Sequence, residues 1–312
     1  MMNEPVLFAV EIGRENVRVL AGYVGARGVA LAGQGSCPAW GISDDGALVD
    51  PLQLAESIRS ALLEAEDEAG DRAVSVYAAV PATLLRQVEA IGRVRVEASE
   101  SGATGARRAQ ELARASTESG FLHLQTRLSR VTVEPVRRDD STATEELEFT
   151  ASYTIFGVHT SDLAPYRRAI ELCGLDVEGL TVAPLAAVDG ALTPDERERG
   201  AILLHLDGDR VDVATCRSGV VQYASTTTLA HLAAELERTG GLDLLPSTLV
   251  LSGEGAELAL DAEDLALIVP VRIAGANLGD RSLPASMTAC VGLVLQAAMA
   301  HAPAQLQLLA SA

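Results

Sequence analysis

The chain has 312 residues and a formal net charge of −19, with an apolar fraction of 48% and an aromatic fraction of only 3%. All 24 basic residues are arginine, so functions that need a P-loop lysine, a Schiff-base lysine or a kinase-type phosphate lysine are excluded. An acidic surface of this size repels nucleic acid and anionic lipid, so we expect no nucleic-acid partner.

Cysteine usage and the lack of targeting signals predict a cytoplasmic protein. The four cysteines, Cys37, Cys173, Cys216 and Cys290, lie far apart without paired spacing, which fits a reducing compartment and argues against a zinc cluster. Near the N-terminus stands Glu4, where a signal peptide would carry a basic region. No apolar run has the length of a membrane span.

One strand–turn–strand pattern occurs twice in the chain. Residues 6–20 and 201–214 both read as an apolar strand, a polar turn that contains glycine, and a second strand with alternating side chains. A third strand follows each copy, at residues 28–33 and 219–223. The repeat predicts two related lobes that face each other across a cleft, in which the two turns could hold a phosphate chain.

A helix with clear end signals follows the first three strands. Asp50 is placed to cap it, Pro51 takes the first helical position, and Gly70 closes its C-terminus. Residues 74–80 then read as a buried strand that ends at a proline. Three strands, a helix and a strand complete a first α/β lobe, which we expect at residues 1–84.

The middle section, residues 85–175, differs from the first lobe in the order of its predicted helices and strands and in its net charge. Residues 86–171 hold 12 Arg and 13 acidic residues and are therefore close to neutral. We expect a small, separate α+β subdomain here. Its predicted elements are strands at residues 88–97, 131–136 and 147–158, an arginine-rich helix at 104–119, and a second helix that Asp162 starts and Gly174 ends.

The second lobe is expected at residues 176–312. After its three strands come a short helix, residues 229–239, and a strand, residues 248–252, that runs into the turn Gly253-Glu254-Gly255. A strand that enters a glycine-containing turn suits the close approach of a ligand or of neighbouring backbone. The last helix, residues 287–300, has an apolar face that predicts core packing.

The order of these elements resembles that of the actin-like ATPases, and four stretches resemble the bacterial cell-division protein FtsA. They are Glu11–Arg18, which is like the first phosphate loop, Gly41–Ile58, Glu64–Tyr77, and Cys173–Glu196 on the approach to the second lobe. The resemblance implies an α/β fold of the actin-like and ribonuclease H-like type, with two lobes, an inserted small α+β subdomain and a reduced second lobe. The pilus-assembly protein PilM shares this architecture and is the second family that the chain resembles.

The second phosphate loop departs from the FtsA pattern, Asp-x-Gly-Gly-Gly-Thr-Thr. The corresponding stretch is His205-Leu206-Asp207-Gly208-Asp209-Arg210-Val211, so one glycine remains of three. Glycines let backbone N–H groups approach an anion, and aspartates in their place invert the local charge. At an effective dielectric near 20, unit charges about 4 Å apart interact by roughly 4 kcal/mol, about half the binding free energy of a micromolar ligand. Only a bridging divalent cation could then turn this repulsion between the aspartates and a phosphate into attraction.

Two segments of FtsA have no counterpart in the pattern. Only about 20 residues, Thr228 to Leu249, stand where FtsA carries a whole subdomain that forms one wall of the nucleotide cleft and docks the tail of FtsZ. Residues 304–309 are a short uncharged run and do not resemble FtsA's basic amphipathic membrane anchor. We therefore expect impaired ATP hydrolysis, polymerisation and FtsZ capture, and no direct membrane anchor.

Three turns supply the candidate nucleotide-binding residues that the resemblance implies. ATP and Mg²⁺ are the ligands that they would hold, and we assign no catalytic residue and no metal ligand. Asp-Gly between two apolar runs is also a strong hairpin signal, and a histidine at a strand end, a candidate general base, is usually only hydrogen-bonded. The candidates are Glu11, Gly13, Arg14 and Arg18 in the first loop, Asp207, Gly208 and Asp209 in the second, and Gly253 and Gly255 in the adenosine-type turn.

The leading hypothesis is a non-enzymatic, FtsA-like cytoplasmic scaffold of cell division, a degenerate ATPase with weak or no nucleotide binding. Its partners would be FtsZ-type or other divisome proteins, which would recruit it to the inner face of the membrane, with self-association as a further option. One alternative is an active filament-forming ATPase in which Mg²⁺ bridges the acidic loops to ATP. The other is a PilM-like adaptor that binds proteins of pilus or secretion assembly.

Overall fold

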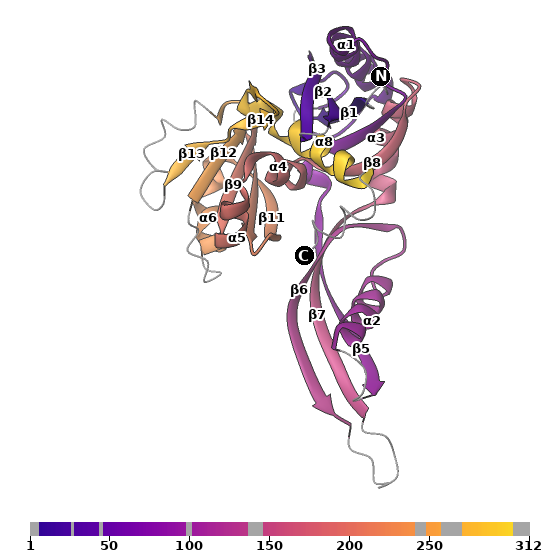
Figure 1. The fold of residues 1–312 in the computed structure, drawn as a ribbon, viewed down its shortest axis with the longest axis vertical. Helices are drawn as coiled ribbons and strands as arrows, with labels where there is room; N and C mark the ends of the chain where they lie inside the picture. The colour runs from indigo at the N-terminus through magenta and orange to yellow at the C-terminus, as the bar shows by residue number, and fades with distance from the viewer. Residues whose placement is uncertain are drawn as a thin grey trace. The chain divides into compact units, whose positions relative to one another are not determined.

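The computed structural model describes residues 6–25, 28–43, 46–97, 102–136, 146–240, 248–256 and 270–301. The chain forms two compact units (Figure 1). One consists of Met1–Leu84 together with Leu163–Ala312, and the other of Leu85–Asp162. The finer division into lobes at residues 1–84 and 176–312, with a subdomain at 85–175, stays a prediction.

The first sheet of the larger unit has the strand order β3-β2-β1-β4-β8. The antiparallel meander β1–β2–β3 is extended by β4, which pairs in parallel with β1, and by β8, which pairs in parallel with β4. Their bounds are β1 (Val6–Ile12), β2 (Asn16–Gly25), β3 (Gly28–Pro38), β4 (Ser75–Val80) and β8 (Asp176–Val182).

Helix α1 (Pro51–Ala69) packs against β2 and β3. It begins as predicted, because the Asp50 side chain accepts hydrogen bonds from the N–H groups of Leu52 and Gln53, and it ends at Gly70 in the left-handed conformation. The helix comes so close to β3 that a Cβ at Gly35 would overlap the backbone of α1. Glycine is therefore required there by close approach.

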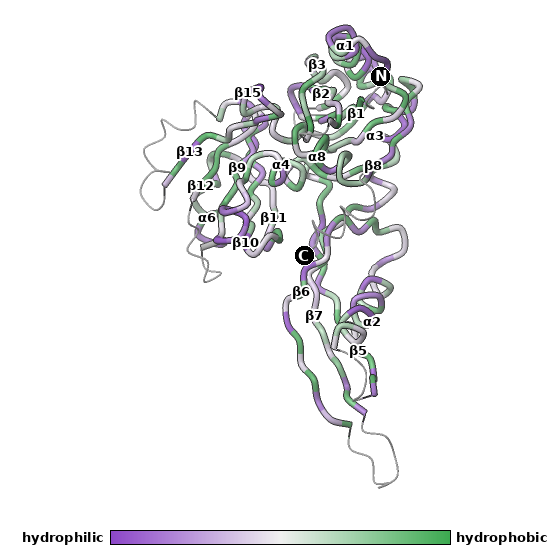
Figure 2. The backbone as a smooth tube through the Cα atoms, viewed as in Figure 1, coloured by the Kyte–Doolittle hydropathy of each residue, from purple (hydrophilic) through white to green (hydrophobic). Residues whose placement is uncertain are grey.

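The second sheet repeats the topology of the first, with the order β11-β10-β9-β12-β13. Its meander β9–β10–β11 is antiparallel, and β12 pairs in parallel with β9, as β4 does with β1. Hydrophobic residues dominate its central strands, β9 and β12 (Figure 2). The bounds are β9 (Ala201–Asp207), β10 (Arg210–Arg217), β11 (Val220–Thr228), β12 (Thr248–Gly253) and β13 (Val271–Ile273).

We use first lobe and second lobe for the parts of the larger unit built on the first and the second sheet, and two helices pack against both sheets. Helix α4 (Ala183–Ala191) packs on α8 (Thr288–His301), and α8 also contacts β1, β2 and β4. The helices cross backbone to backbone, since a Cβ at Gly190 or at Gly292 would overlap the facing helix. The remaining elements are η1 (Ala82–Leu84), α5 (Pro194–Arg199), η2 (Leu229–His231), α6 (Leu232–Gly240), β14 (Ala276–Leu278), β15 (Arg281–Leu283) and η3 (Ala285–Met287).

The smaller unit is an antiparallel sheet of order β5-β7-β6 with α2 on one face. Strand β6 starts ten residues before the strand predicted at 131–136, because its polar first half pairs with β7 and hydrogen-bonds across the sheet, as Arg127 does to Thr154. Figure 2 shows the alternation of hydrophilic and hydrophobic residues along β6. The elements are β5 (Arg86–Glu97), α2 (Gly102–Ala115), β6 (Phe121–Pro135) and β7 (Glu146–His159), followed by α3 (Thr160–Glu171).

None of the helices in the described ranges is both long and apolar enough to cross a membrane.

Candidate functional site

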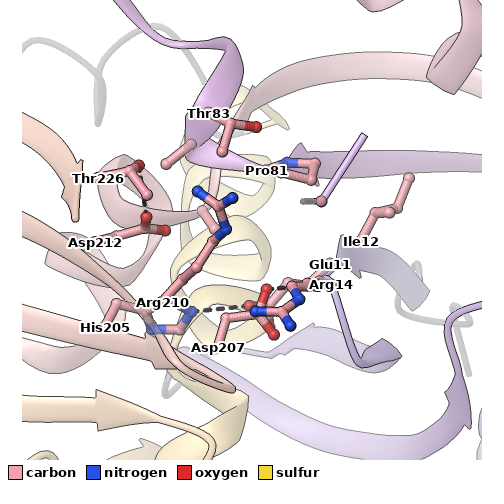
Figure 3. A pocket seen from close by; sticks show the side chains of 14 residues that line it. Glu11, Ile12, Arg14, Pro81, Thr83, His205, Asp207, Arg210, Asp212 and Thr226 are labelled. Carbon is pink, nitrogen blue, oxygen red and sulfur yellow. Dashed lines mark hydrogen bonds and ion pairs between the residues drawn. The ribbon is translucent and has the colours of Figure 1, made fainter. Parts of the chain in front are cut away.

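The turns of the two repeated hairpins meet. The backbone N–H of Arg14, in the β1–β2 turn, donates a hydrogen bond of 2.6 Å to Oδ2 of Asp207 at the end of β9. The Arg14 guanidinium also forms an ion pair with Asp209. Gly208, with φ of +67°, lies so close to Glu15 that a Cβ would overlap its carboxylate. The hairpin tips are therefore clasped together, with side chains of the second loop seated on the first (Figure 3).

A buried ion pair lies behind this clasp and also joins the two lobes. Nε2 of His205 is 3.0 Å from Oε1 of Glu11, and its Nδ1 is 3.0 Å from the hydroxyl of Ser252. Burial alone would raise the pKa of Glu11, but the hydrogen bond from His205 and the charge of Arg18 outweigh it and lower that pKa. Burial likewise opposes protonation of His205, and the bond to Glu11 and its charge raise the pKa nonetheless. Both groups therefore favour their charged forms.

A second carboxylate is held by the first lobe at the glycine turn. Oε2 of Glu254 accepts a hydrogen bond of 2.6 Å from the side-chain amide of Asn16 and pairs with the Arg18 guanidinium. Arg18 is 4% exposed and also lies 3.8 Å from Glu11. The backbone N–H of Glu254 donates to the carbonyl of Leu206 at 2.9 Å, which ties the turn to β9.

Asp212 is a second buried acid of the site, beside Glu11. It lies on β10 directly opposite His205 on β9 and Thr226 on β11, and the Thr226 hydroxyl donates a hydrogen bond of 2.8 Å to its Oδ1. Burial raises the pKa of Asp212 to about 7, and the charge of His205 opposes this only in part. The nearby carboxylates of Asp207 and Glu11 raise it further.

Two hollows border these residues. The one beneath the clasp has a volume of only about 20 Å³ and is lined by Glu11, Arg14, Asp207 and Asp212, among others. A cavity of that size accommodates about one water molecule. The other, of about 440 Å³, is open and lies beside Asn16, Arg18 and the turn at residues 253–256.

The structure brings all nine sequence-predicted site residues to this region. Seven lie at the hairpin tips or directly behind them, and Gly253 and Gly255, with φ of +83° and +82°, form the turn that carries Glu254. Their role in holding a nucleotide stays a prediction. The hairpin members are Glu11, Gly13, Arg14, Arg18, Asp207, Gly208 and Asp209.

Both ring nitrogens of His205 are engaged, one by Glu11 and one by Ser252, which agrees with the expectation that a histidine at a strand end is hydrogen-bonded. The aspartates of the second loop contact Arg14, which was not foreseen as their counter-charge. Among the described residues, no cluster of three or more His, Cys, Asp or Glu side chains could hold a metal ion.

Sequence reasoning missed three contributors to the site. Asn16 had no recognisable signal, because a polar residue after a tight turn is ordinary. Ser252 ends an apolar strand and was read only as part of the approach to the glycine turn. Asp212 did carry a signal: it is the one acid within the otherwise apolar run of β10.

The duplicated meander with its parallel fourth strand, and the helix pair between the sheets, define an actin-like fold. The chain of PilM in the PilM–PilN type IV pilus biogenesis complex has a TM-score of 0.64 at 17% identity, with 93% of this chain and 98% of that chain covered. The ethanolamine utilization protein EutJ from Carboxydothermus hydrogenoformans has a TM-score of 0.52 at 11% identity, with coverages of 94% and 90%.

In sequence the chain is similar to the cell division protein FtsA. It is 25% identical to FtsA of Pseudomonas aeruginosa over 230 residues, which are 72% of this chain and 54% of that protein. The identity to FtsA of Escherichia coli K12 is 26% over 222 residues, or 70% and 52%. The chain matches no protein-family model and spans about half the length of these curated relatives. The chain is therefore similar to FtsA in sequence and has an actin-like fold.

Proposed function

We propose that the chain is a non-enzymatic, FtsA-like scaffold of cell division whose nucleotide cleft is held shut by its own side chains. It acts in the cytoplasm and is recruited to the inner face of the membrane by the proteins that it binds. Those partners are FtsZ-type or other divisome proteins, and self-association is a further mode of assembly. The similarity to FtsA over about 70% of the chain supports the setting in cell division.

The observation that carries the proposal is the hydrogen bond from the Arg14 N–H to Asp207. Backbone N–H groups in such a turn are the donors that a phosphate oxygen would need. Here a carboxylate that belongs to the chain takes one of them, and its neighbour Asp209 pairs with the Arg14 guanidinium. The hollow behind the clasp holds about 20 Å³, against roughly 300 Å³ or more for an ordinary small-molecule site, and this small volume supports a loss of chemistry on a γ-phosphate.

A specific observation favours one alternative, a PilM-like adaptor of pilus or secretion assembly. The structural match covers 98% of the PilM chain, whereas the sequence match covers only about half of FtsA. The two roles predict different partners for the same fold. Purification of the tagged chain from its native cells, followed by identification of the bound proteins, separates them: division proteins support the scaffold, and pilus or secretion proteins support the adaptor.

Calorimetric titration with Mg-ATP tests the absence of nucleotide function. We expect no binding in the sub-millimolar range and no ATP turnover by the full chain. Sub-millimolar binding that is lost in Glu11→Ala or Asp207→Ala would refute the proposal and favour a filament-forming ATPase. The same preparation, examined by sedimentation with and without Mg-ATP, shows whether assembly depends on the nucleotide.

A further inference from the structure

The pairing of Glu254 with Arg18 and Asn16 is unusual for a surface acid. Two donors from the first lobe converge on a single carboxylate oxygen, Oε2. Arg18 is a buried cation with a side chain 5% exposed, whereas the side chain of Glu254 is 41% exposed. Arg18 thus belongs to the protein interior and Asn16 is half-buried, whereas the acid that pairs with both reaches in from the surface.

The backbone around Glu254 is built to present that side chain. Gly253 and Gly255 both adopt positive φ, which residues with a Cβ rarely adopt. A Cβ at Gly253 would overlap the backbone of Leu206, so the turn lies directly against β9. The positive φ of the two flanking glycines, and the hydrogen bond from the Glu254 N–H to Leu206, fix the position of this turn against β9.

The chemistry of this arrangement is that of an anion site. A guanidinium and an amide N–H that converge on one oxygen bind a phosphate oxygen as readily as a carboxylate oxygen. The open pocket of about 440 Å³ beside them, lined by Ser36, Pro284, Ala285 and Ser286 as well as the glycine turn, is larger than the carboxylate requires. Its volume lies within the range of ordinary small-molecule sites.

We propose that Arg18 and Asn16 form a site for a diphosphate-type anion and that Glu254 occupies it as an intramolecular phosphate mimic. The inference rests on the proposed function, because it explains how a cleft with a phosphate-binding ancestry is kept from anions in the native chain. Removal of one surface carboxylate then uncovers the site. Binding needs no change at the hairpin clasp, since the pocket is open to solvent.

The expected gain in anion affinity follows from competition between the Glu254 carboxylate and the ligand for the same donors. A ligand that needs a site populated in only a fraction of molecules binds more weakly by that fraction, so occupancy of 90% by Glu254 corresponds to about tenfold weaker binding. A tethered group in a rigid turn acts at an effective concentration in the millimolar range or above. We therefore expect Glu254→Ala to bind inorganic pyrophosphate at least about tenfold more tightly than the native chain, and Glu254→Gln to lie between them because it keeps the acceptor without the charge.

The experiment is a calorimetric titration of the 312-residue chain and of its variants Glu254→Ala and Glu254→Gln with pyrophosphate at low ionic strength. Glu237→Ala, at an exposed position of α6 outside the pocket, is the control for the change in net charge. Asn16→Ala in the Glu254→Ala background is expected to reverse part of the gain. A thermal melt of each variant verifies that it is folded.

The outcomes separate this inference from the proposed function. Tighter binding by Glu254→Ala alone, reduced again by Asn16→Ala, supports the site. Equal affinities for the native chain, the Glu254 variants and the Glu237 control overturn it, as does an equal gain in the control, and either result leaves the closed-cleft scaffold standing. If the native chain itself binds Mg-ATP below millimolar concentration, the proposed function fails, whatever pyrophosphate does.

Discussion

The buried carboxylate of Asp212 makes a sharp prediction about stability and pH. An acid with a pKa of about 7 in the folded protein and about 3.8 when unfolded is protonated on folding at intermediate pH. Between these two values the folded state binds more protons than the unfolded state, so this group makes stability fall as pH rises. The loss begins above pH 3.8 and is complete above pH 7.

The magnitude follows from the shift. Each pKa unit corresponds to 1.36 kcal/mol, so Asp212 lowers the free energy of unfolding by about 3 kcal/mol between pH 5 and pH 8. Asp212→Asn removes this ionisation and keeps an oxygen that can accept from Thr226. We therefore compare the free energy of unfolding of the variant with that of the native chain at each pH. From pH 5 to pH 8 this difference should shift by about 3 kcal/mol in favour of the variant.

Urea denaturation at the two pH values, followed by circular dichroism, measures the effect. Asp280→Asn, in the exposed turn between β14 and β15, changes the net charge equally and is expected to show no such pH dependence. The reasoning is refuted if Asp212→Asn shifts stability by the same amount at both pH values. It is also refuted if the Asp280 control reproduces the change.

Two further predictions concern the Glu11 ion pair and the packing of the glycine turn against β9. Glu11→Gln leaves His205 and Arg18 buried without their full counter-charge and is expected to cost about 3–5 kcal/mol in urea unfolding. This loss of stability should be largest between about pH 4.5 and 6.5, where both Glu11 and His205 are charged in the native chain. It should become smaller as pH rises through the raised pKa of His205. A loss of stability that does not depend on pH would contradict the ion pair. Both Gly253 and Gly255 have positive φ, so an alanine at either position strains the backbone, and Gly255→Ala is expected to lose about 1–2 kcal/mol of stability for this reason alone. At Gly253 the added Cβ also overlaps Leu206, whereas the space around Gly255 is open. The melting temperature of Gly253→Ala should therefore lie well below that of Gly255→Ala. Equal melting temperatures for the two variants would remove the packing argument.

Much of the fold was predictable because it depends on sequence patterns that extend over only a few residues. The two strand–turn–strand hairpins, the Asp-Gly turn at residues 207–208 and the capped helix from Pro51 all have short-range causes, and the structure confirms them. The first half of β6 was not predictable in this way. Its polar side chains are compensated by hydrogen bonds to β7, and those partners lie about 27 residues along the chain.

The site shows where local reasoning stops. From the sequence, Asp207 and Asp209 are two uncompensated negative charges that repel a phosphate. In the structure they are bonded to Arg14, which is 193 and 195 residues away in the chain. Charge interactions fall off with distance in space, not along the chain, so the effect of these aspartates depends on which residues the fold brings next to them.

The sequence by itself therefore determined the α/β class, the duplicated strand–turn–strand units and the turns at which a ligand site would lie, since glycine, proline and periodic apolar residues act over a few positions. Only the tertiary structure decided what fills those turns. It seats Asp207 on the Arg14 N–H, Glu254 on Arg18 and His205 on Glu11, three contacts between segments about 190 residues or more apart. These long-range neighbours set the local charge of the cleft and decide whether its hydrogen-bond donors are available to an anion. The reason is that burial and proximity, and not residue type alone, decide the energy of a charge.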